Sequence, residues 1–437
     1  MLEKIESREA VVAVIGLGYV GLPLAVAKAK GGFEVIGIER KRERVDMVNN
    51  AENYISDVPE EDLEAAVDAG NLQATQDFSV VEKADVVTIC VPTPLDEAKN
   101  PVTKYIENVV EKSLPYAHEG QLFILESTTY PGTTQEVIQP RLEEAGFSVG
   151  EDVYLAFSPE RVDPGNENYR TGNTPKVVGG VTQDCTEIAQ ALYREVIDGG
   201  IHAVSSPAVA ELEKLFENVF RIVNISLVNE LAMLADRMGI DIWEVIEAAK
   251  TKPFGFMPFY PGPGLGGHCI PLDPFYLSWK AKQTGFSTRF IELAGQINDQ
   301  MPGYVTERAM ELLNTKGIAL KGADVLMVGV AYKEGIEDTR ESPALEIGEK
   351  LVQRGADLSY HDPYVREVNI GNERFSSVEL SDELLDRADL VLITTAHSDV
   401  DYGMIVDTAD LIYDTRNALG DYEGDNIYKL GNNSVKG

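Results

Sequence analysis

The stretch AVVAVIGLGYVGLPLAVAKAKGG, residues 10–32, constrains the fold more than any other part of the chain. A short β-branched run leads through three glycines into helix formers, which predicts a strand, a tight turn and a helix. Gly16 permits the turn, Gly18 lets backbone amides approach a pyrophosphate, and Gly21 lets the helix pack close to the strand. The phosphates of a dinucleotide would then lie at a helix N-terminus.

A second apolar run, FEVIGIER, places Glu39 about 20 residues beyond the first glycine, where a dinucleotide fold holds the ribose. A carboxylate there accepts hydrogen bonds from the ribose hydroxyls and repels a 2′-phosphate, so we predict NAD as the cofactor. The alternative is NADP, because a basic cluster that could hold a phosphate follows directly: Arg40, Lys41, Arg42 and Arg44.

Two more apolar runs end in hydroxyl-bearing residues. ADVVTICVPTP ends at Thr93 and its flanking prolines, and QLFILESTTYPGTT carries Thr129 after its apolar part. Ligands of parallel sheets lie beyond the carboxyl ends of the strands, so both threonines are candidates for lining the cofactor cleft. The alternative is that they are ordinary turn-forming residues.

Composition narrows the class of protein. A chain of 437 residues is long enough for two or three domains. Its 72 acidic and 38 basic side chains give a net charge of −34, which repels nucleic acid and anionic membranes. The acid is spread along the chain, and we interpret it as the solvated surface of a protein from a salt-rich cytoplasm; the alternative is a merely acidic protein.

The cysteines and the N-terminus indicate a reducing compartment. Three widely separated cysteines form no disulfide framework and show no metal-ligand spacing, so no metal is predicted. The N-terminal residues have no signal-peptide pattern, and no run of 18 apolar residues occurs. We expect a soluble, cytoplasmic protein without membrane contacts.

A long helix is predicted over residues 206–238, where apolar residues recur at helical spacing without an internal Gly or Pro after the start. Lys214 and Asn218 lie four residues apart, so they share one face of this helix. Buried together, they would act as fixed donors toward an oxyanion. The alternative is a solvated helix face.

Residues 251–279, TKPFGFMPFYPGPGLGGHCIPLDPFYLSW, are predicted to form an ordered loop that passes into a helix just after Asp273. Its glycines, Gly264, Gly266 and Gly267, would let a ligand approach the backbone. Cys269 and Asp273 would lie near the helix start, where the dipole favours a thiolate. Cys269 is therefore a candidate nucleophile toward an aldehyde.

The other cysteines, Cys90 and Cys185, fit the ordinary case of a buried, inert thiol. His268 is a poor candidate for the base of Cys269, because adjacent side chains point apart in most backbones. Residues 318–437 form another predicted α/β unit, with apolar runs such as ADVLMVGVAY and ADLVLITTAHSD but no GxGxxG.

Seven ordered motifs make the chain closely similar to the UDP-sugar 6-dehydrogenase family from residue 11 to about residue 420. They are GLGYVGLPLA, VPTP, ESTTYPGTT, SPERVDPGN, ELEKLFENVF, GPGLGGHCIPLDP and VGVAYKEGIEDTRESPA. The resemblance implies an α/β fold of two Rossmann-like, doubly wound domains joined by a long central helix that forms a dimer interface. We expect an NAD-binding domain over residues 1–200, a helical dimerisation and catalytic-loop region over 201–315, and a UDP-binding domain over 316–437.

The family oxidises a C6 alcohol to a carboxylate in two NAD-dependent steps, so the resemblance implies roles for individual residues. Cys269 would hold a thiohemiacetal and then a thioester, while Lys214 and Asn218 would stabilise the oxyanion. Asp273 would orient Lys214 or the hydrolytic water. Thr129 and Glu160 would position water and move a proton, with Glu160 the general base of thioester hydrolysis.

Cofactor and substrate residues carry over in the same way. The cofactor set is Gly16, Gly18, Tyr19, Val20, Gly21, Glu39, Arg44, Thr93, Thr129 and Arg340. The substrate set is Glu160, Arg161, Lys214, Asn218, Phe259, Tyr260, Gly266 and Lys333, with Arg416 as a further basic candidate for the UDP; for these basic residues the alternative is simple surface charge.

The segment SPERVDPGN decides the expected sugar. In the UDP-glucose branch a glutamate stands four residues after the first one, where this chain has Pro164. The segment ERVDPGN is more like that of the branch that oxidises UDP-N-acetylhexosamines, UDP-N-acetylglucosamine above all. Arg161 would then contact the sugar or its acyl group. The alternatives are UDP-glucose, UDP-N-acetylmannosamine, a two-electron 3-hydroxyacid dehydrogenase, and a nucleotide-sugar-binding protein without catalysis.

Overall fold

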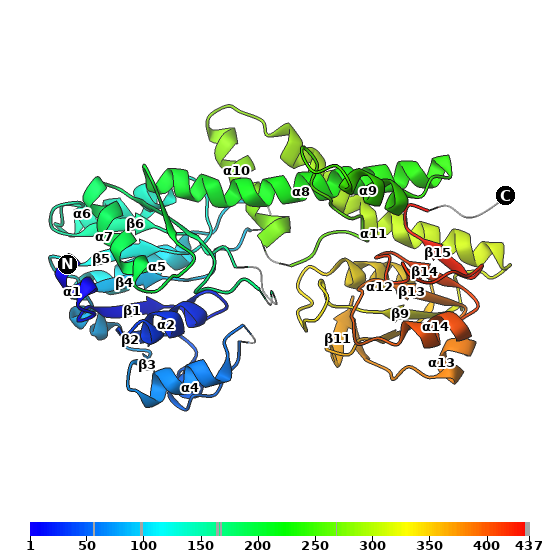
Figure 1. Ribbon diagram of the computed structural model, residues 1–437, viewed down its shortest axis with the longest axis horizontal. Helices are drawn as coiled ribbons and strands as arrows, with labels where there is room; N and C mark the ends of the chain where they lie inside the picture. Colours follow the sequence, from blue (N-terminus) through cyan, green and yellow to red (C-terminus); the bar gives the residue numbers. More distant parts are fainter. Residues whose placement is uncertain (56, 97–98, 163–165, 167, 268, 433–437) are drawn as a thin grey trace. The chain divides into compact units, whose positions relative to one another are not determined.

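The computed structural model describes residues 1–55, 57–96, 99–162, 166, 168–267 and 269–432, and of Cys269 it describes the backbone alone. The chain divides into two compact units. Unit 1 comprises Met1–Glu217 and Phe275–Phe286, and unit 2 comprises Asn218–Pro274 and Ser287–Gly437. Figure 1 shows the two units in the colours of the sequence.

Unit 1 is built on one eight-stranded sheet with the order β3-β2-β1-β4-β5-β6-β7-β8. All neighbouring strands run parallel except the pair β6 and β7. This is the doubly wound order that the glycine motif predicts. The strands are β1 (Val11–Ile15), β2 (Glu34–Ile38), β3 (Leu72–Thr75), β4 (Val86–Ile89), β5 (Leu122–Leu125), β6 (Tyr154–Phe157), β7 (Lys176–Gly180) and β8 (Ile201–Val204).

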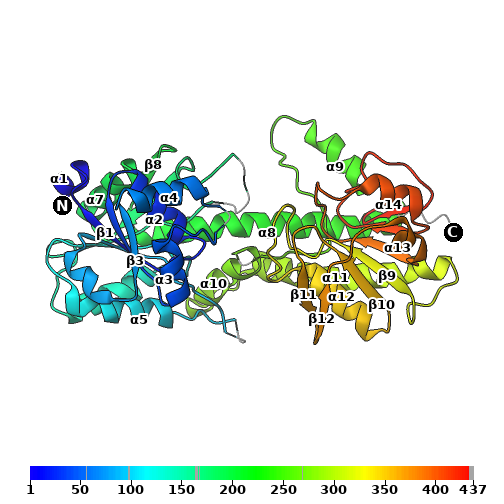
Figure 2. The same ribbon diagram turned by 90° about the horizontal axis from the view of Figure 1, so that it is seen from below.

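Helices cover both faces of this sheet, as the two views of Figures 1 and 2 show. Alternate residues of β1 belong to different cores: Val12 and Val14 pack in one hydrophobic cluster, and Ala13 and Ile15 in another. That alternation is the period of a strand buried on both faces. The helices are α1 (Leu2–Glu6), α2 (Gly21–Lys30), α3 (Arg42–Asn49), α4 (Glu60–Asp68), α5 (Lys104–Ser113), α6 (Gln139–Glu144) and α7 (Gln183–Arg194), with short turns η1 (Phe78–Lys83), η2 (Leu114–Tyr116) and η3 (Thr134–Ile138).

Unit 2 contains a five-stranded, all-parallel sheet with the order β10-β9-β13-β14-β15 and a separate hairpin of β11 and β12. The second α/β unit predicted from the sequence is therefore confirmed. Its strands are β9 (Asp324–Val328), β10 (Asp357–His361), β11 (Glu367–Ile370), β12 (Glu373–Ser376), β13 (Leu390–Ile393), β14 (Ile412–Asp414) and β15 (Ile427–Lys429). Its helices are α9 (Ile242–Lys250), α11 (Arg289–Thr315), α12 (Pro343–Gln353), α13 (Asp382–Arg387) and α14 (Tyr402–Thr408).

The long helix α8 (Pro207–Met238) has the bounds that its periodicity predicts, and the chain passes from unit 1 to unit 2 within it. Its length and hydropathy alone would suit a membrane span. Glu211 and Asn229 on this helix are nevertheless fully buried in protein. Glu211 accepts a hydrogen bond from Thr134 in unit 1, and Asn229 donates one to Asn298 in unit 2. These contacts show that one side of α8 packs into the fold of each unit.

Helix α10 (Cys269–Gln283) begins five residues before the predicted start, which was Pro274, just after Asp273. The prediction was wrong because it treated Pro271 as a helix breaker. Pro271 lies in the first turn, where the missing N–H would have no intrahelical partner, so the proline is tolerated there. Cys269 is consequently the first residue of α10, and Asp273 lies about one turn later.

Candidate active site

The glycine turn of unit 1 leaves open space at one of its three glycines. Gly16 has φ +92°, and a Cβ atom on it would lie 2.6 Å from the carbonyl oxygen of Cys90. A Cβ on Gly21 would meet the carbonyl oxygen of Gly16 at 1.8 Å, whereas one on Gly18 would have nothing within 4 Å. Gly16 and Gly21 therefore serve packing, and the open space at Gly18, before the N-terminus of α2, fits a dinucleotide pyrophosphate.

Glu39 is buried beside this turn. Its carboxylate accepts hydrogen bonds from the backbone N–H groups of Leu17 at 3.1 Å and Lys41 at 2.9 Å. The guanidinium of Arg44 lies over the ring of Tyr54, 5.2 Å from its centroid, and Arg42 pairs with Asp46 at 3.0 Å. Arg42 and Arg44 of the basic cluster thus already interact with other side chains of the protein. Because the carboxylate of Glu39 lies beside the turn, these residues fit NAD better than NADP.

Tyr19 and Val20 complete the turn; the side chain of Tyr19 is half exposed, and Val20 is partly buried. Thr93 and Thr129 follow β4 and β5, at the carboxyl edge of the sheet where the sequence predicts them. The hydroxyl of Thr93 donates to the carbonyl oxygen of Thr128 at 2.5 Å, and the hydroxyls of Thr129 and Thr133 lie 2.9 Å apart.

Glu160 follows β6 at the same edge, with a side chain only 15% exposed. Its carboxylate accepts hydrogen bonds from the N–H groups of Arg161 at 2.8 Å and Val162 at 2.9 Å. Burial would raise the pKa of Glu160, but Lys176, these two N–H groups and Lys214 outweigh it, and the pKa lies below its usual range. The carboxylate is therefore ionised at neutral pH.

A buried ionic group that the sequence analysis missed lies next to Glu160. Lys176 Nζ is 3.6 Å from Glu160 Oε2 and donates to Glu126 Oε2 at 2.7 Å. The hydroxyl of Tyr193 donates to the other oxygen of Glu126, and all three of these partners are almost fully buried. The signals in the sequence were a lysine opening the apolar run KVVGG and a glutamate directly after FIL.

Arg161 is held within unit 1 rather than left open for a ligand. Its guanidinium donates to the carboxylate of Glu217 and to the carbonyl oxygen of Pro175 at 2.8 Å, and lies 3.4 Å from Glu213. Burial and the neighbouring Glu217 raise the pKa of Glu213 to about 7. Arg161 thus ties the segment after β6 to α8, and its contact with a sugar remains a prediction.

Lys214 and Asn218 are both buried, so the alternative of a solvated helix face is wrong for these two side chains. In unit 2, Asn218 Nδ2 donates to the buried carboxylate of Asp273 at 2.7 Å. The structure thus gives Asp273 a partner on α8 that the sequence analysis did not assign to it. The side chain of Cys269 and the whole of His268 and Pro164 lie outside the described residues.

The glycines before α10 make room for other parts of unit 2. A Cβ on Gly266 would lie 2.5 Å from Cβ of Tyr332, one on Gly267 would lie 2.9 Å from the Tyr332 ring, and one on Gly264 would lie 3.0 Å from Pro343. Each of the three glycines therefore has a packing reason, because neighbouring side chains fill the space that a Cβ would take; the approach of a ligand to this backbone stays a prediction.

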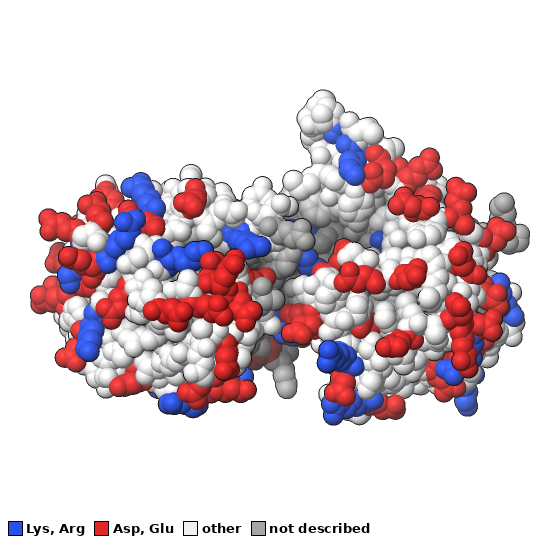
Figure 3. Space-filling view, turned by 60° about the horizontal axis from the view of Figure 1, so that its bottom comes forward, with Lys and Arg blue, Asp and Glu red and all other residues white. Residues whose placement is uncertain are grey.

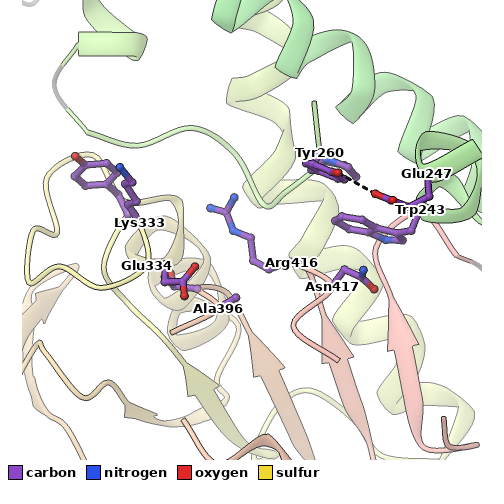
Figure 4. Close-up of a pocket in the computed structure, with 11 residues that line it drawn as sticks. Trp243, Glu247, Tyr260, Lys333, Glu334, Ala396, Arg416 and Asn417 are labelled. Atoms are coloured by element: carbon purple, nitrogen blue, oxygen red, sulfur yellow. Dashed lines mark hydrogen bonds between the residues drawn. The ribbon is translucent and has the colours of Figure 1, made fainter. Parts of the chain in front are cut away.

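A pocket of about 420 Å³ lies entirely within unit 2 (Figure 4). Tyr260 and Trp243 stack on one side of it with ring centroids 6.1 Å apart, and the Tyr260 hydroxyl donates to Glu247 at 2.8 Å. Lys333 and Arg416 supply its positive charge. The full lining is Trp243, Glu247, Tyr260, Pro261, Tyr332, Lys333, Glu334, Thr395, Ala396, Arg416 and Asn417. Of these lining residues, Tyr260, Lys333 and Arg416 were predicted from the sequence as substrate-binding candidates, and the others were not.

Arg416 follows β14 and extends into this pocket in Figure 4. Its Nε donates to the carbonyl oxygen of Thr394 at 3.1 Å. Burial lowers the pKa of Arg416 to about 10 although Asp414 opposes the shift, so the guanidinium stays charged at neutral pH. Phe259, from the same loop as Tyr260, packs edge to face against Phe220 of α8 at 5.7 Å.

The loop that carries Lys333 is fixed by a buried pair, Asp362 and His397. Asp362 accepts the N–H of Val330 at 2.7 Å and lies 3.1 Å from Nε2 of His397, whose Nδ1 accepts the N–H of Gly335 at 3.1 Å. Burial would raise the pKa of Asp362, but its hydrogen bonds with His397 and Val330 lower it to about 2.

Arg340 belongs to unit 2, where its guanidinium pairs with Asp338 at 2.6 Å and its carbonyl oxygen accepts the N–H of Gly267 at 3.0 Å. A role for Arg340 in cofactor binding stays a prediction. Over the residues that the structure describes, no cluster of three or more His, Cys, Asp or Glu side chains could hold a metal ion.

Three family models match successive parts of the chain. They describe the NAD-binding domain (residues 10–197), the central domain (208–300) and the UDP-binding domain (326–421) of the UDP-glucose/GDP-mannose dehydrogenase family. The chain belongs to this family. It is an NAD-dependent UDP-sugar dehydrogenase, with a Rossmann-like cofactor domain at its N-terminal side.

Similar proteins carry different substrate names. The dehydrogenase is 38% identical over 355 residues to UDP-N-acetyl-D-glucosamine 6-dehydrogenase of Pseudomonas aeruginosa, covering 81% of this chain and 83% of the relative. It is 35% identical to UDP-N-acetyl-D-mannosamine dehydrogenase of Methanocaldococcus jannaschii over 96% of both chains. The solved structure of UDP-D-ManNAc dehydrogenase from Pyrococcus horikoshii has a TM-score of 0.88 and 32% identity, and covers 97% of this chain and 100% of that one.

Proposed function

We propose that this dehydrogenase oxidises the C6 alcohol of a UDP-N-acetylhexosamine, in the first place UDP-N-acetylglucosamine, to the uronate. The observation that carries the proposal is the pocket of unit 2. Stacked aromatic rings suit a base, and Lys333 and Arg416 suit a diphosphate, in a chain whose net charge of −34 otherwise repels anions.

Cys269 is the proposed nucleophile. Its thiolate adds to the C6 aldehyde that the first oxidation produces, and the C–S bond of the resulting thiohemiacetal becomes that of a thioester in the second oxidation. NAD accepts one hydride in each oxidation. The first turn of α10 favours the thiolate, because the peptide dipoles place partial positive charge at a helix N-terminus.

Hydrolysis of the thioester needs a base and fixed donors. Glu160 is ionised and takes a proton from water as the water oxygen bonds to the carbonyl carbon; Cys269 then leaves as a thiolate. Lys214 and Asn218 are buried donors suited to stabilise the oxyanion, and the bond from Asn218 to Asp273 fixes the orientation of its amide. Thr129 is proposed to hold the water.

The remaining assignments follow the same scheme. Gly16, Gly18, Tyr19, Val20, Gly21, Glu39, Arg44, Thr93 and Thr129 are proposed to bind NAD together with Arg340. The proposed substrate contacts are Arg161, Phe259, Tyr260 and Gly266, in addition to Lys333. The division into residues 1–200, 201–315 and 316–437 is proposed as the functional division into cofactor domain, dimerisation and catalytic-loop region, and UDP domain.

UDP-N-acetylmannosamine is the second candidate substrate. It is favoured by the relatives from Methanocaldococcus jannaschii and Pyrococcus horikoshii, whose names carry that sugar and which match almost the whole chain. The segment ERVDPGN and the 38% identical relative from Pseudomonas aeruginosa favour UDP-N-acetylglucosamine. The two sugars differ at C2, so direct comparison as substrates separates them.

The test is NADH production from each sugar at high salt: UDP-N-acetylglucosamine, -mannosamine and -galactosamine, and UDP-glucose. The proposal expects two NADH for each sugar consumed; one NADH contradicts the thioester route, and none indicates a binding protein. The variant C269S should lose turnover by at least about 1000-fold while binding NAD as the wild type does, because the nucleophile is lost and the cofactor site in unit 1 is unchanged.

A homodimer is part of the proposal. Helix α8 exposes large apolar side chains along its unit 2 part: Phe220, Leu227, Leu231, Leu234 and Met238. Exposed apolar groups of this number suit a subunit interface. Acidic side chains are scattered over the face shown in Figure 3, which suits the proposed salt-rich cytoplasm. The proposed product, a UDP-linked uronate, suits polysaccharide biosynthesis.

A further inference from the structure

We propose that Lys176 is a positioning residue of the reaction, which holds the carboxylate of Glu160 in place and keeps it ionised. The inference rests on the proposed role of Glu160 as the base of thioester hydrolysis. Lys176 does not touch the substrate; it acts through Glu160. Neither composition nor motif spacing draws attention to it.

The geometry is that of one ammonium group between two carboxylates. Lys176 opens β7, and its Nζ lies 2.7 Å from Glu126 Oε2 and 3.6 Å from Glu160 Oε2. The same Nζ donates to the carbonyl oxygen of Pro159 at 3.2 Å, so the residue before Glu160 is held as well. The lysine is therefore attached to both the backbone and the side chain of the segment that carries the proposed base.

Glu126 fixes Lys176 from the interior. Its side chain has no exposed surface, one oxygen accepts from Lys176, and the other accepts from the hydroxyl of Tyr193. Lys176 also lies 5.2 Å from the centroid of the Tyr193 ring. A buried ammonium group with partners on three sides has little freedom to turn away, so Glu160 has a fixed counter-charge.

Among the residues that the structure describes, the titratable groups that influence the pair belong to unit 1. Glu160 is influenced by Lys176 on β7 and by Lys214 on α8, and it receives the N–H groups of Arg161 and Val162. Lys176 is influenced by Glu126 after β5, by Glu160 and by Cys90 after β4, and Lys28 of α2 and Tyr193 of α7 also interact with it. Burial would lower the pKa of Lys176, but the two glutamates outweigh it and the pKa is raised, so the ammonium stays charged at neutral pH.

Removing this charge leaves only Lys214 and the two N–H groups to oppose the effect of burial on the pKa of Glu160. A carboxyl group that loses an opposite charge within about 4 Å rises in pKa by about one unit or more. Glu160 would then become protonated at a higher pH than in the wild type and would be unable to take a proton from water in that more acidic range. The thioester on Cys269 would persist, and activity would return as the pH is raised.

The test compares the pH dependence of kcat in the wild type and three variants. K176M should move the acid limb of kcat upward by about one pH unit or more, with recovery above it, and should show a burst of NADH before slow turnover at a pH on the shifted limb. K176R should restore the wild-type limb. K28M is the matched control, because Lys28 is buried in the same interior and interacts with Glu126 and Lys176, but it donates to the Thr88 hydroxyl at 2.6 Å and is not among the groups that influence Glu160.

A second measurement follows the carboxyl group of Glu160 directly, by ¹³C NMR titration of glutamate-labelled protein with E160Q to assign the signal. If K176M fails to fold, the double variant K176M/E126Q replaces it, since it also removes the fully buried carboxylate that would lose its hydrogen-bonded ammonium partner. An unchanged acid limb and an unchanged Glu160 titration in the folded variant overturn the inference. Absence of NADH from every UDP-sugar contradicts the proposed function instead, and the titration still decides the role of Lys176.

Discussion

Gly266 lies where one added methyl group has no room. A Cβ atom there would be 2.5 Å from Cβ of Tyr332 and 2.8 Å from the carbonyl oxygen of Glu341. Neither neighbour is the far end of a flexible side chain: one is a first side-chain atom and the other is backbone. The backbone of the loop before α10 would have to move in the variant G266A.

The expected loss of stability is that of an overpacked interior, about 2–3 kcal/mol. No backbone strain adds to it, because Gly266 is absent from the glycines with positive φ. With a urea m-value of about 2 kcal/mol/M, the unfolding midpoint of unit 2 should fall by about 1 M. The loop that leads into Cys269 moves with the change, so turnover should fall too.

The assay uses the two tryptophans of the chain. Trp243 belongs to unit 2 and Trp279 to unit 1, so a W279F background leaves a fluorescence signal that reports unit 2 alone. G303A is the matched control: Gly303 lies inside α11, and a Cβ on it would meet nothing within 4 Å. Alanine there should leave stability unchanged or raise it by about 0.5–1 kcal/mol. A G266A protein as stable as G303A would refute the packing argument.

Two further predictions concern unit 2. R416M should raise the Kd for UDP, measured by calorimetry, at least about tenfold, since a charge-assisted hydrogen bond to phosphate contributes about 1.5–3 kcal/mol; unchanged affinity would remove Arg416 from the site. D362N should destabilise unit 2 by about 2 kcal/mol at pH 7, because the pKa of Asp362 is lowered to about 2 by its partners. A carboxyl group whose pKa is lowered in the folded state stabilises the protein at pH values above its unfolded pKa, and this contribution is lost as the pH falls through the folded pKa. The difference in unfolding free energy between D362N and the wild type should therefore vanish as the pH falls from about 4 to 2. A constant difference over that range would contradict this linkage.

The sequence was most informative where local chemistry decides the structure. The glycine turn, the position of Glu39 and the long helix α8 follow from backbone sterics and periodicity, and the structure has them where they were expected. The start of α10 was missed because proline is a breaker only where an N–H is needed.

Tertiary contacts could not be read in the same way. Lys176 meets Glu126 across 50 residues of sequence, and Arg161 meets Glu217 across 56. Nothing in the local pattern of either residue identifies its partner, because only the tertiary packing of strands and of helix α8 brings them together. The glycines of the catalytic loop show the same limit: their number was visible, but Tyr332, which occupies the space they leave, lies on a distant segment.

The two backbone hydrogen bonds of Glu39 bear on how cofactor preference can change in evolution or by design. Its carboxylate binds the N–H of Leu17 in the glycine turn and the N–H of Lys41 at the start of α3. A substitution that admits a 2′-phosphate also removes the acceptor that joins these two segments. A switch to NADP at this position therefore needs a second change that satisfies both N–H groups, so single substitutions are expected to lose the old cofactor before they gain the new one.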